Sequence, residues 1–149
     1  MAGRTTLLVA VLAAMLGSGC GGQLAAAPGA GSTTRASVSW YEGVSERGSF
    51  TARWRSDTEP IPNNEPFRLE LELLDPEGRT LAGDVQVFVH AWMPAHRHGM
   101  LRRSVATRRD DGRFDVRGML LHMGGHWKIF VDVVHDGDLE QASFDLEIE

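Results

Sequence analysis

Apolar and polar residues alternate along much of the chain after residue 60, in short stretches typical of β-strands. The clearest is the stretch FRLELELL at residues 67–74, in which every second side chain is apolar and charged residues stand between them. The same period of two recurs at residues 85–89, 114–116, 127–133 and 144–148. A strand with this period buries one face and exposes the other. No part of the body has a convincing helical period, so the pattern predicts an all-β fold.

Turn signals separate these strands. DPEG at residues 75–78, DDG at 110–112 and DGD at 136–138 combine residues that favour tight turns. Three weaker strands are expected near residues 38–41, 48–55 and 103–107. Short strands divided by regular turns favour two packed antiparallel sheets. We therefore expect an antiparallel β-sandwich of about seven or eight strands.

The first nineteen residues have the organisation of a secretory signal peptide. Arg4 gives a positive start, residues 7–16 are apolar, and small residues follow. The apolar stretch is too short for a membrane-spanning helix, so the pattern indicates export.

A lipobox-like sequence, GSGC, ends this leader at residues 17–20. Cys20 is the only cysteine of the chain, and lipidation would remove a thiol that is a liability in an oxidising compartment. We expect a periplasm-facing lipoprotein, anchored through Cys20 to a bacterial membrane of the cell envelope. The alternative is cleavage near residues 25–27, which would leave a soluble secreted protein without this cysteine.

The rest of the chain forms one domain behind a tether. Residues 20–37 are mostly Gly, Ala, Ser, Thr and Pro, a composition typical of a flexible linker. Residues 38–149 are sufficient for one modest domain. The formal charge is −5, and removal of the leader with Arg4 makes it −6. This acidic balance argues against nucleic acid as a partner.

Methionine and histidine are concentrated in two short segments, HAWMPAHRHGM at residues 90–100 and MLLHMGGH at residues 119–126. Every methionine outside the leader lies in them, as does every histidine except His135. Imidazole and thioether are neutral ligands for copper, and thioether favours Cu(I). The stretch between His90 and Asp110 has no Asp or Glu, which argues against calcium or magnesium. Zinc seldom uses methionine, so copper fits best.

Strand ends place both segments in loops, which in a sandwich collect at the same rim. On extended backbone, His96 and His98 would point to the same side and chelate one metal. The predicted ligands are Met93, His96, His98 and Met100, with a second group of His122, Met123 and His126. Met119 lies beside two leucines and fits core packing better.

A metal-free interpretation stays open. In it the loop is a rigid turn, the methionines fill the core, and the protein is an immunoglobulin-like binding or structural module. His90, at the expected end of a strand, is equally consistent with an interior histidine and a ligand. The arginines after the loop indicate either a solvated face or a basic rim for an acidic partner or lipid head groups, namely Arg102, Arg103, Arg108 and Arg109.

The chain offers no recognisable catalytic arrangement. Neither a Ser-His-Asp nor a Cys-His set is apparent. The His96-x-His98 pair lacks the nearby glutamate that cupins add to such a pair, and it lacks the further ligands and disulfide expected of a copper-zinc dismutase. We therefore expect a protein that is not an enzyme.

Three motifs in residues 65–149 resemble the YtkA-like and FixH-like group of small exported domains. They are MPxHxHGM at residues 93–100, G-x-F at residues 112–114 with Met119, and G-x-W at residues 125–127 leading into a Val-rich strand. The resemblance implies an immunoglobulin-like β-sandwich. It also implies a role near copper handling, such as delivery to a copper enzyme or assembly of one in the cell envelope.

Overall fold

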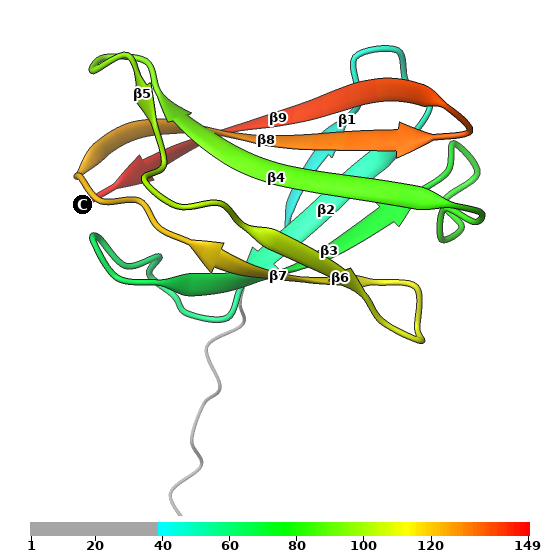
Figure 1. Ribbon diagram of the computed structural model, residues 1–149, viewed down its shortest axis with the longest axis horizontal. Helices are drawn as coiled ribbons and strands as arrows, with labels where there is room; N and C mark the ends of the chain where they lie inside the picture. Colours follow the sequence, from blue (N-terminus) through cyan, green and yellow to red (C-terminus); the bar gives the residue numbers. More distant parts are fainter. Residues whose placement is uncertain (1–38) are drawn as a thin grey trace, which may run out of the picture. The chain divides into compact units, whose positions relative to one another are not determined.

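The computed structural model describes residues 39–149, in which nine strands form two antiparallel sheets (Figure 1). The signal peptide, the linker and Cys20 lie outside the described residues. In chain order the strands are β1 (Tyr41–Val44), β2 (Thr51–Ser56), β3 (Phe67–Leu74), β4 (Val85–Met93), β5 (His98–Gly99), β6 (Val105–Arg108), β7 (Phe114–Met119), β8 (Gly125–His135) and β9 (Asp138–Ile148).

The two sheets have the strand orders β1-β2-β3-β7-β6 and β5-β4-β8-β9. The orders β2-β3-β7-β6 and β4-β8-β9 match the ABED and CFG sheets of an immunoglobulin domain. The predicted β-sandwich is therefore confirmed, with more strands than expected because β5 adds a two-residue strand at one edge. Residues 39–149 contain no helix that could cross a membrane.

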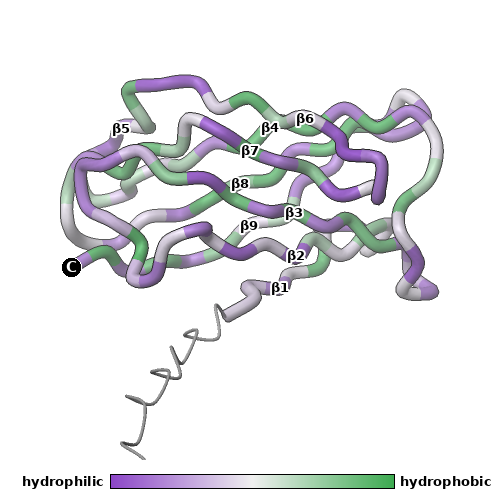
Figure 2. Tube along the Cα trace, turned by 90° about the horizontal axis from the view of Figure 1, so that it is seen from below, coloured by the Kyte–Doolittle hydropathy of each residue, from purple (hydrophilic) through white to green (hydrophobic). Residues whose placement is uncertain are grey.

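Alternating side chains of the two sheets make the core. Along β3 the apolar residues that the sequence pattern selected, Phe67 to Leu73, are each at most 3% exposed. The same alternation of hydrophobic and hydrophilic positions is visible along the strands in Figure 2. Trp54 of β2 and Trp127 of β8 are fully buried, one from each sheet. Burial of such large side chains supplies much of the stability of the sandwich.

Strand β4 runs past His90, where the sequence pattern placed its end, and stops at Met93. The inward alternation continues through Ala91 and Met93, which are 2% and 3% exposed. Ala91 pairs with Ile129 of β8, and Met93 pairs with His98 of β5. Met93 therefore lies in a strand and faces the core, and the loop begins only at Pro94.

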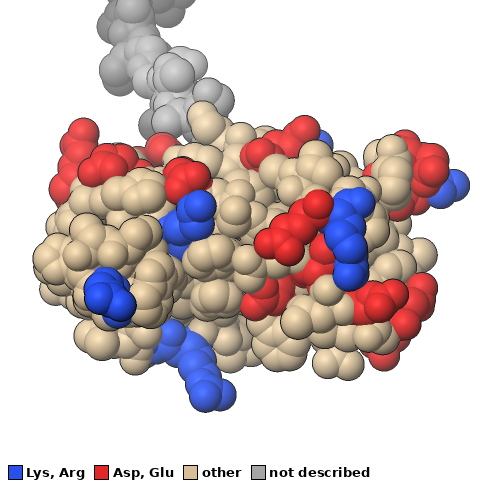
Figure 3. Space-filling model, turned by 90° about the horizontal axis from the view of Figure 1, so that it is seen from above, with Lys and Arg blue, Asp and Glu red and all other residues tan. Residues whose placement is uncertain are grey.

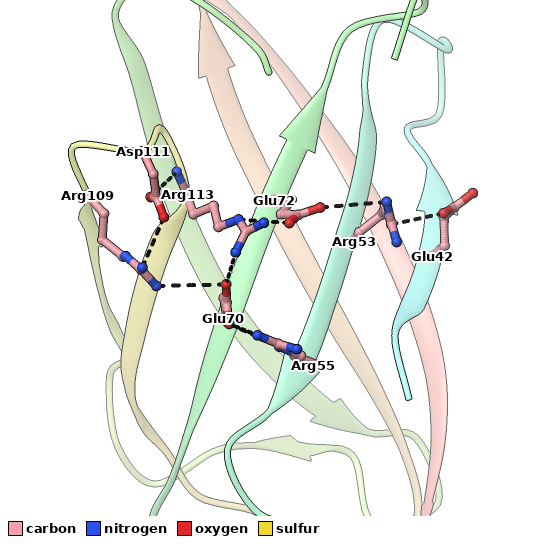
Figure 4. Close-up of polar contacts among 8 residues, drawn as sticks. All are labelled: Glu42, Arg53, Arg55, Glu70, Glu72, Arg109, Asp111 and Arg113. Carbon is pink, nitrogen blue, oxygen red and sulfur yellow. Dashed lines mark hydrogen bonds and ion pairs between the residues drawn. The ribbon is translucent and has the colours of Figure 1, made fainter. Parts of the chain in front are cut away.

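A ladder of ion pairs crosses the outer face of the five-stranded sheet (Figure 4). Glu70 accepts a hydrogen bond of 2.7 Å from Arg113 and pairs with Arg55 at 2.5 Å. Glu72 pairs with Arg113 at 2.8 Å and with Arg53 at 3.7 Å. Burial raises the pKa of Glu70, but the hydrogen bonds from Arg55 and Arg113 outweigh it, so the pKa is lowered. Charge on this face is thus internally paired.

Candidate metal site at the rim of the sandwich

Two segments far apart in the sequence form one rim of the sandwich. The first is the hairpin of β4 and β5 with its turn at residues 94–97, and the second is the connection between β7 and β8. That connection is held at two points. The backbone N–H of Asn64 donates to the Leu121 carbonyl at 2.7 Å, and the indole N–H of Trp127 donates to the Met123 carbonyl at 2.9 Å. The side chains at this rim therefore rest on a fixed backbone.

His98 and His122 meet at this rim. Their ring centroids are 4.9 Å apart and their planes are tilted by 32°. Both rings meet the Trp127 indole in a T-shaped arrangement, at centroid distances of 5.7 Å for His98 and 5.6 Å for His122. The expectation that the two Met/His segments come together is thus met by one histidine from each.

Met93 lies directly opposite His98 in the β4–β5 pair. Residues opposite one another on antiparallel strands project from the same face of a sheet, so the thioether and the imidazole are neighbours. The methyl group of Met93 rests against Gly125, where a Cβ atom would lie only 3.1 Å from it. Met93 thus joins the core to the histidine pair.

Each inner histidine keeps a nitrogen available for a metal. The Nδ1 atom of His98 lies 3.2 Å from the Gly99 carbonyl, which can only accept, so Nδ1 donates its proton and leaves the Nε2 lone pair free. The Nδ1 atom of His122 is buried and has no hydrogen-bond partner among residues 39–149. A buried polar atom without a partner costs free energy, and a bound metal ion would supply the missing partner. The donor set therefore fits a metal.

His96 takes a different position from the one expected. It lies in the turn rather than on extended backbone, because Arg97 adopts a positive φ of 57° that reverses the chain. Its ring is exposed and lies 5.9 Å from that of His98, tilted by 48°. His96 and His98 are neighbours, but they do not project in parallel from one strand.

The remaining methionines lie around the rim with different degrees of burial. Met100 and Met123 are half buried and pack against the core, whereas Met119 is fully buried within it. The packing role expected of Met119 agrees with this burial.

Two other histidines lie away from the rim, on the outer face of the four-stranded sheet. His126 is exposed, and its Nε2 atom lies 2.9 Å from Asp145. His90 is exposed as well, lies 3.1 Å from Asp132 and stacks on Phe130 at a centroid distance of 5.0 Å. The structure therefore separates His126 from the other predicted ligands, and it places His90 on the surface rather than in the interior.

Histidines alone do not complete this site. Within residues 39–149, no group of three or more His, Cys, Asp or Glu side chains is placed to hold a metal ion. Beside the two imidazoles, the rim offers the thioether of Met93, which lies opposite His98.

Two residues of the rim were not among the predicted site residues. Trp127 forms the wall that both inner histidine rings touch, and Gly125 provides the space for the Met93 methyl group. Both residues belong to the G-x-W motif of the sequence. The motif alone does not show that they face inward together, which follows from the alternation of β8.

Only two of the arginines after the loop border the rim. Trp92, Met100, Arg102 and Arg103 are among the residues that line one groove of about 380 Å³. Arg108 instead donates to the carbonyl groups of Leu81 and Gly83, at 2.7 Å each, and Arg109 pairs with Asp111 at 2.9 Å. In Figure 3, acidic residues gather along the upper and right parts of the face, and the lower left carries basic residues alone.

Comparison with known proteins adds a distant structural likeness. No model of a known protein family matches the chain, and no curated protein matches it. The crystal structure of FetP from the uropathogenic E. coli strain F11, expressed in the periplasm of E. coli, superposes with a TM-score of 0.44. The alignment covers 74% of this chain and 98% of that chain at 11% identity. The fold assignment rests on the strand order and register of this chain itself.

Proposed function

We propose that this protein is an exported copper-binding domain that handles or delivers copper in the cell envelope. The observation that carries the proposal is the buried Nδ1 atom of His122, which has no hydrogen-bond partner in the described part of the chain and belongs to a ring beside that of His98. His98 offers a free Nε2 lone pair, and the Met93 thioether lies opposite it.

The chemistry of these donors favours copper over other metals. Two imidazoles and a thioether form a neutral, partly soft set, which suits copper and, through sulfur, Cu(I). Calcium and magnesium need oxygen ligands, and zinc seldom takes methionine. Asp145 pairs with His126 of the second segment, but this pair lies on the outer face of the sheet.

Features of the sequence support the cellular part of the proposal. The leader and the GSGC sequence support export and attachment to a membrane through Cys20. The resemblance of residues 93–100 to YtkA-like and FixH-like domains supports a role in delivery to a copper enzyme or in its assembly.

The test is titration of the purified exported protein with Cu(I) and with Cu(II). We expect binding tighter than micromolar, weakened more than about tenfold by His98→Ala or His122→Ala, since even loss of a residue that only orients a ligand typically costs about tenfold in affinity. Met93→Leu is the matched variant for sulfur, because it keeps the apolar volume and should cost less than about 1.5 kcal/mol of stability. His126→Ala is the control.

Three results would count against copper binding at this rim. The first is the absence of binding tighter than micromolar. The second is binding by the His98 and His122 variants that equals that of the unmodified protein, and the third is a loss of affinity in the His126 control as large as in those variants. Steady-state dismutase and oxidase assays on copper-loaded protein test the further proposal that the domain is not an enzyme, which clear turnover would contradict.

A metal-free immunoglobulin-like module is the second candidate, and the burial of the methionines favours it. Met93 is 3% exposed and Met119 is fully buried, as expected of residues whose role is packing. In that case Met93→Leu, His98→Ala and His122→Ala would leave every copper titration unchanged.

A further inference from the structure

Three histidine rings form a series that leads from solvent into the rim. His96 is exposed, His98 is half buried, and His122 is half buried with its Nδ1 atom fully enclosed. The centroid distances are 5.9 Å from His96 to His98 and 4.9 Å from His98 to His122. Among the described residues, no ring contact joins His96 to His122 directly. His98 is therefore the shared neighbour of an outer and an inner imidazole.

We propose that His96 is a transfer ligand, which receives a copper ion at the surface and passes it to His98 and His122. This inference rests on the proposed function, and it assigns to His96 a role in exchange rather than in final binding. In the transfer, His122 forms its nitrogen–copper bond as His96 releases its own, while His98 holds the ion throughout. The oxidation state of copper does not change, and each ring binds through a lone pair, so no proton moves.

The backbone of the turn suits this role because it is held in place. The N–H groups of His96 and Arg97 both donate to the Met93 carbonyl, at 3.2 and 2.9 Å. The ring of His96, by contrast, makes no hydrogen bond within residues 39–149. Rotation of this exposed side chain is fast, in the range of picoseconds to nanoseconds. The ring can therefore change its orientation while the hairpin keeps His98 and Met93 in position.

The inner pair suits the final site for the opposite reason. His98 is fixed by its hydrogen bond to Gly99, and both inner rings rest against Trp127. Within this inner pair, His98 lies opposite the buried Met93 in the β4–β5 hairpin. Copper bound there would have less contact with water than copper on His96, so affinity should be determined by the inner residues and rate by the outer one.

The experiment compares rates and equilibria of copper exchange in the exported protein and its His96→Ala variant. Cu(I) is presented as the complex of a coloured bidentate chelator, whose absorbance follows uptake in a stopped-flow instrument. We expect His96→Ala to slow uptake and release equally, each by fivefold or more, and to change the dissociation constant by less than about threefold. Equal slowing is required because uptake and release of copper cross the same free-energy barrier, and a transfer ligand lowers that barrier for both directions.

His126→Ala serves as the matched control, since it removes another exposed histidine from the same domain and should change neither rates nor affinity. Trp127 touches both inner rings, so its share of the fluorescence of the four tryptophans should be quenched when copper arrives at the inner pair.

Two outcomes would overturn the inference while leaving the proposed function intact. A loss of affinity in His96→Ala as large as in His122→Ala would make His96 a permanent ligand. Unchanged rates and affinity would give His96 no part in exchange. Failure of the unmodified protein to bind copper is a separate result, which would remove the proposed function and this inference with it.

Discussion

Single residues determine the shape of the rim, and Gly125 is the clearest case. Its φ of 113° is a conformation that residues with a side chain rarely adopt, and its open side receives the methyl group of Met93. The sequence places Gly125 in the G-x-W motif but does not show which neighbour requires the missing side chain. That neighbour comes from β4, which is adjacent only after the sheet has formed.

Replacement of Gly125 by alanine should destabilise the domain by more than backbone strain alone. We expect Gly125→Ala to lower the free energy of unfolding by about 1–3 kcal/mol, because it combines an unfavourable φ with a contact against Met93. Gly137→Ala is the control, since Gly137 has a φ of 87° and no atom near its open side. Urea unfolding measures both, and an equal loss in the two variants would exclude a contribution from the Met93 contact.

The histidines show how much of the site can be predicted from residue type. The sequence indicated that the two Met/His segments would meet at one rim of the sandwich, and His98 and His122 do meet there. The position of His96 could not be predicted in the same way, because it depends on the positive φ of Arg97 in the turn. The pairing of His126 with Asp145 also depends on register, which sets His126 opposite Glu147 and its side chain on the outer face.

At the scale of elements, strands with a strict period of two were predicted well and short irregular ones were not. β3 and β8 follow from their own alternation. The end of β4 and the whole of β5 do not, because Trp92 is exposed on the outer face and His98 and Gly99 carry no strand signal of their own. These strands exist through their pairing with one another, which local sequence does not reveal.

A buried carboxylate joins strand β9 to the turn between β1 and β2. Glu140 is 6% exposed and accepts hydrogen bonds from the Ser49 hydroxyl and from the backbone N–H of Arg47, the latter at 2.7 Å. Burial alone raises the pKa of Glu140, but hydrogen bonds from Ser45, Ser49 and Arg47 outweigh it and lower the pKa to about 2.

This carboxylate should make stability depend on pH in acid. Because the folded pKa lies below the ordinary value of 4.5, its contribution is complete above pH 4.5 and is lost as the pH falls towards 2. Glu140→Gln should therefore be less stable than the unmodified protein at pH 7, and the difference should shrink between pH 4.5 and 2. Urea unfolding across this range measures it, with Glu147→Gln, an exposed carboxylate on the same strand, as the control. A difference independent of pH would contradict the assignment.

At the scale of the whole molecule, the rim and the core are parts of one packed unit. Met93 belongs to the hydrophobic core and also lies opposite His98, so a ligand bound at the rim would favour the folded state. A ligand that binds only the folded protein stabilises it according to its concentration relative to its dissociation constant.

Copper should therefore raise the stability of the entire sandwich. At free copper about one hundred times the dissociation constant, we expect the free energy of unfolding to rise by about 2.7 kcal/mol. Thermal unfolding followed by circular dichroism measures the change. His98→Ala should lose most of the increase and His126→Ala should keep it, and an equal increase in both variants would indicate binding elsewhere on the surface.

The segment that follows β5 has a consequence for how copies of this protein behave at high concentration. Beyond its short pairing with β5, β4 is an edge strand, and open edges recruit strands of other chains into aggregates. The Met100 N–H donates to the Ala91 carbonyl at 3.2 Å, and the Ser104 hydroxyl donates to the Val89 carbonyl. Residues 100–104 thus cover part of the exposed edge, so the segment that follows the histidine hairpin should hinder the addition of strands from other copies of the protein.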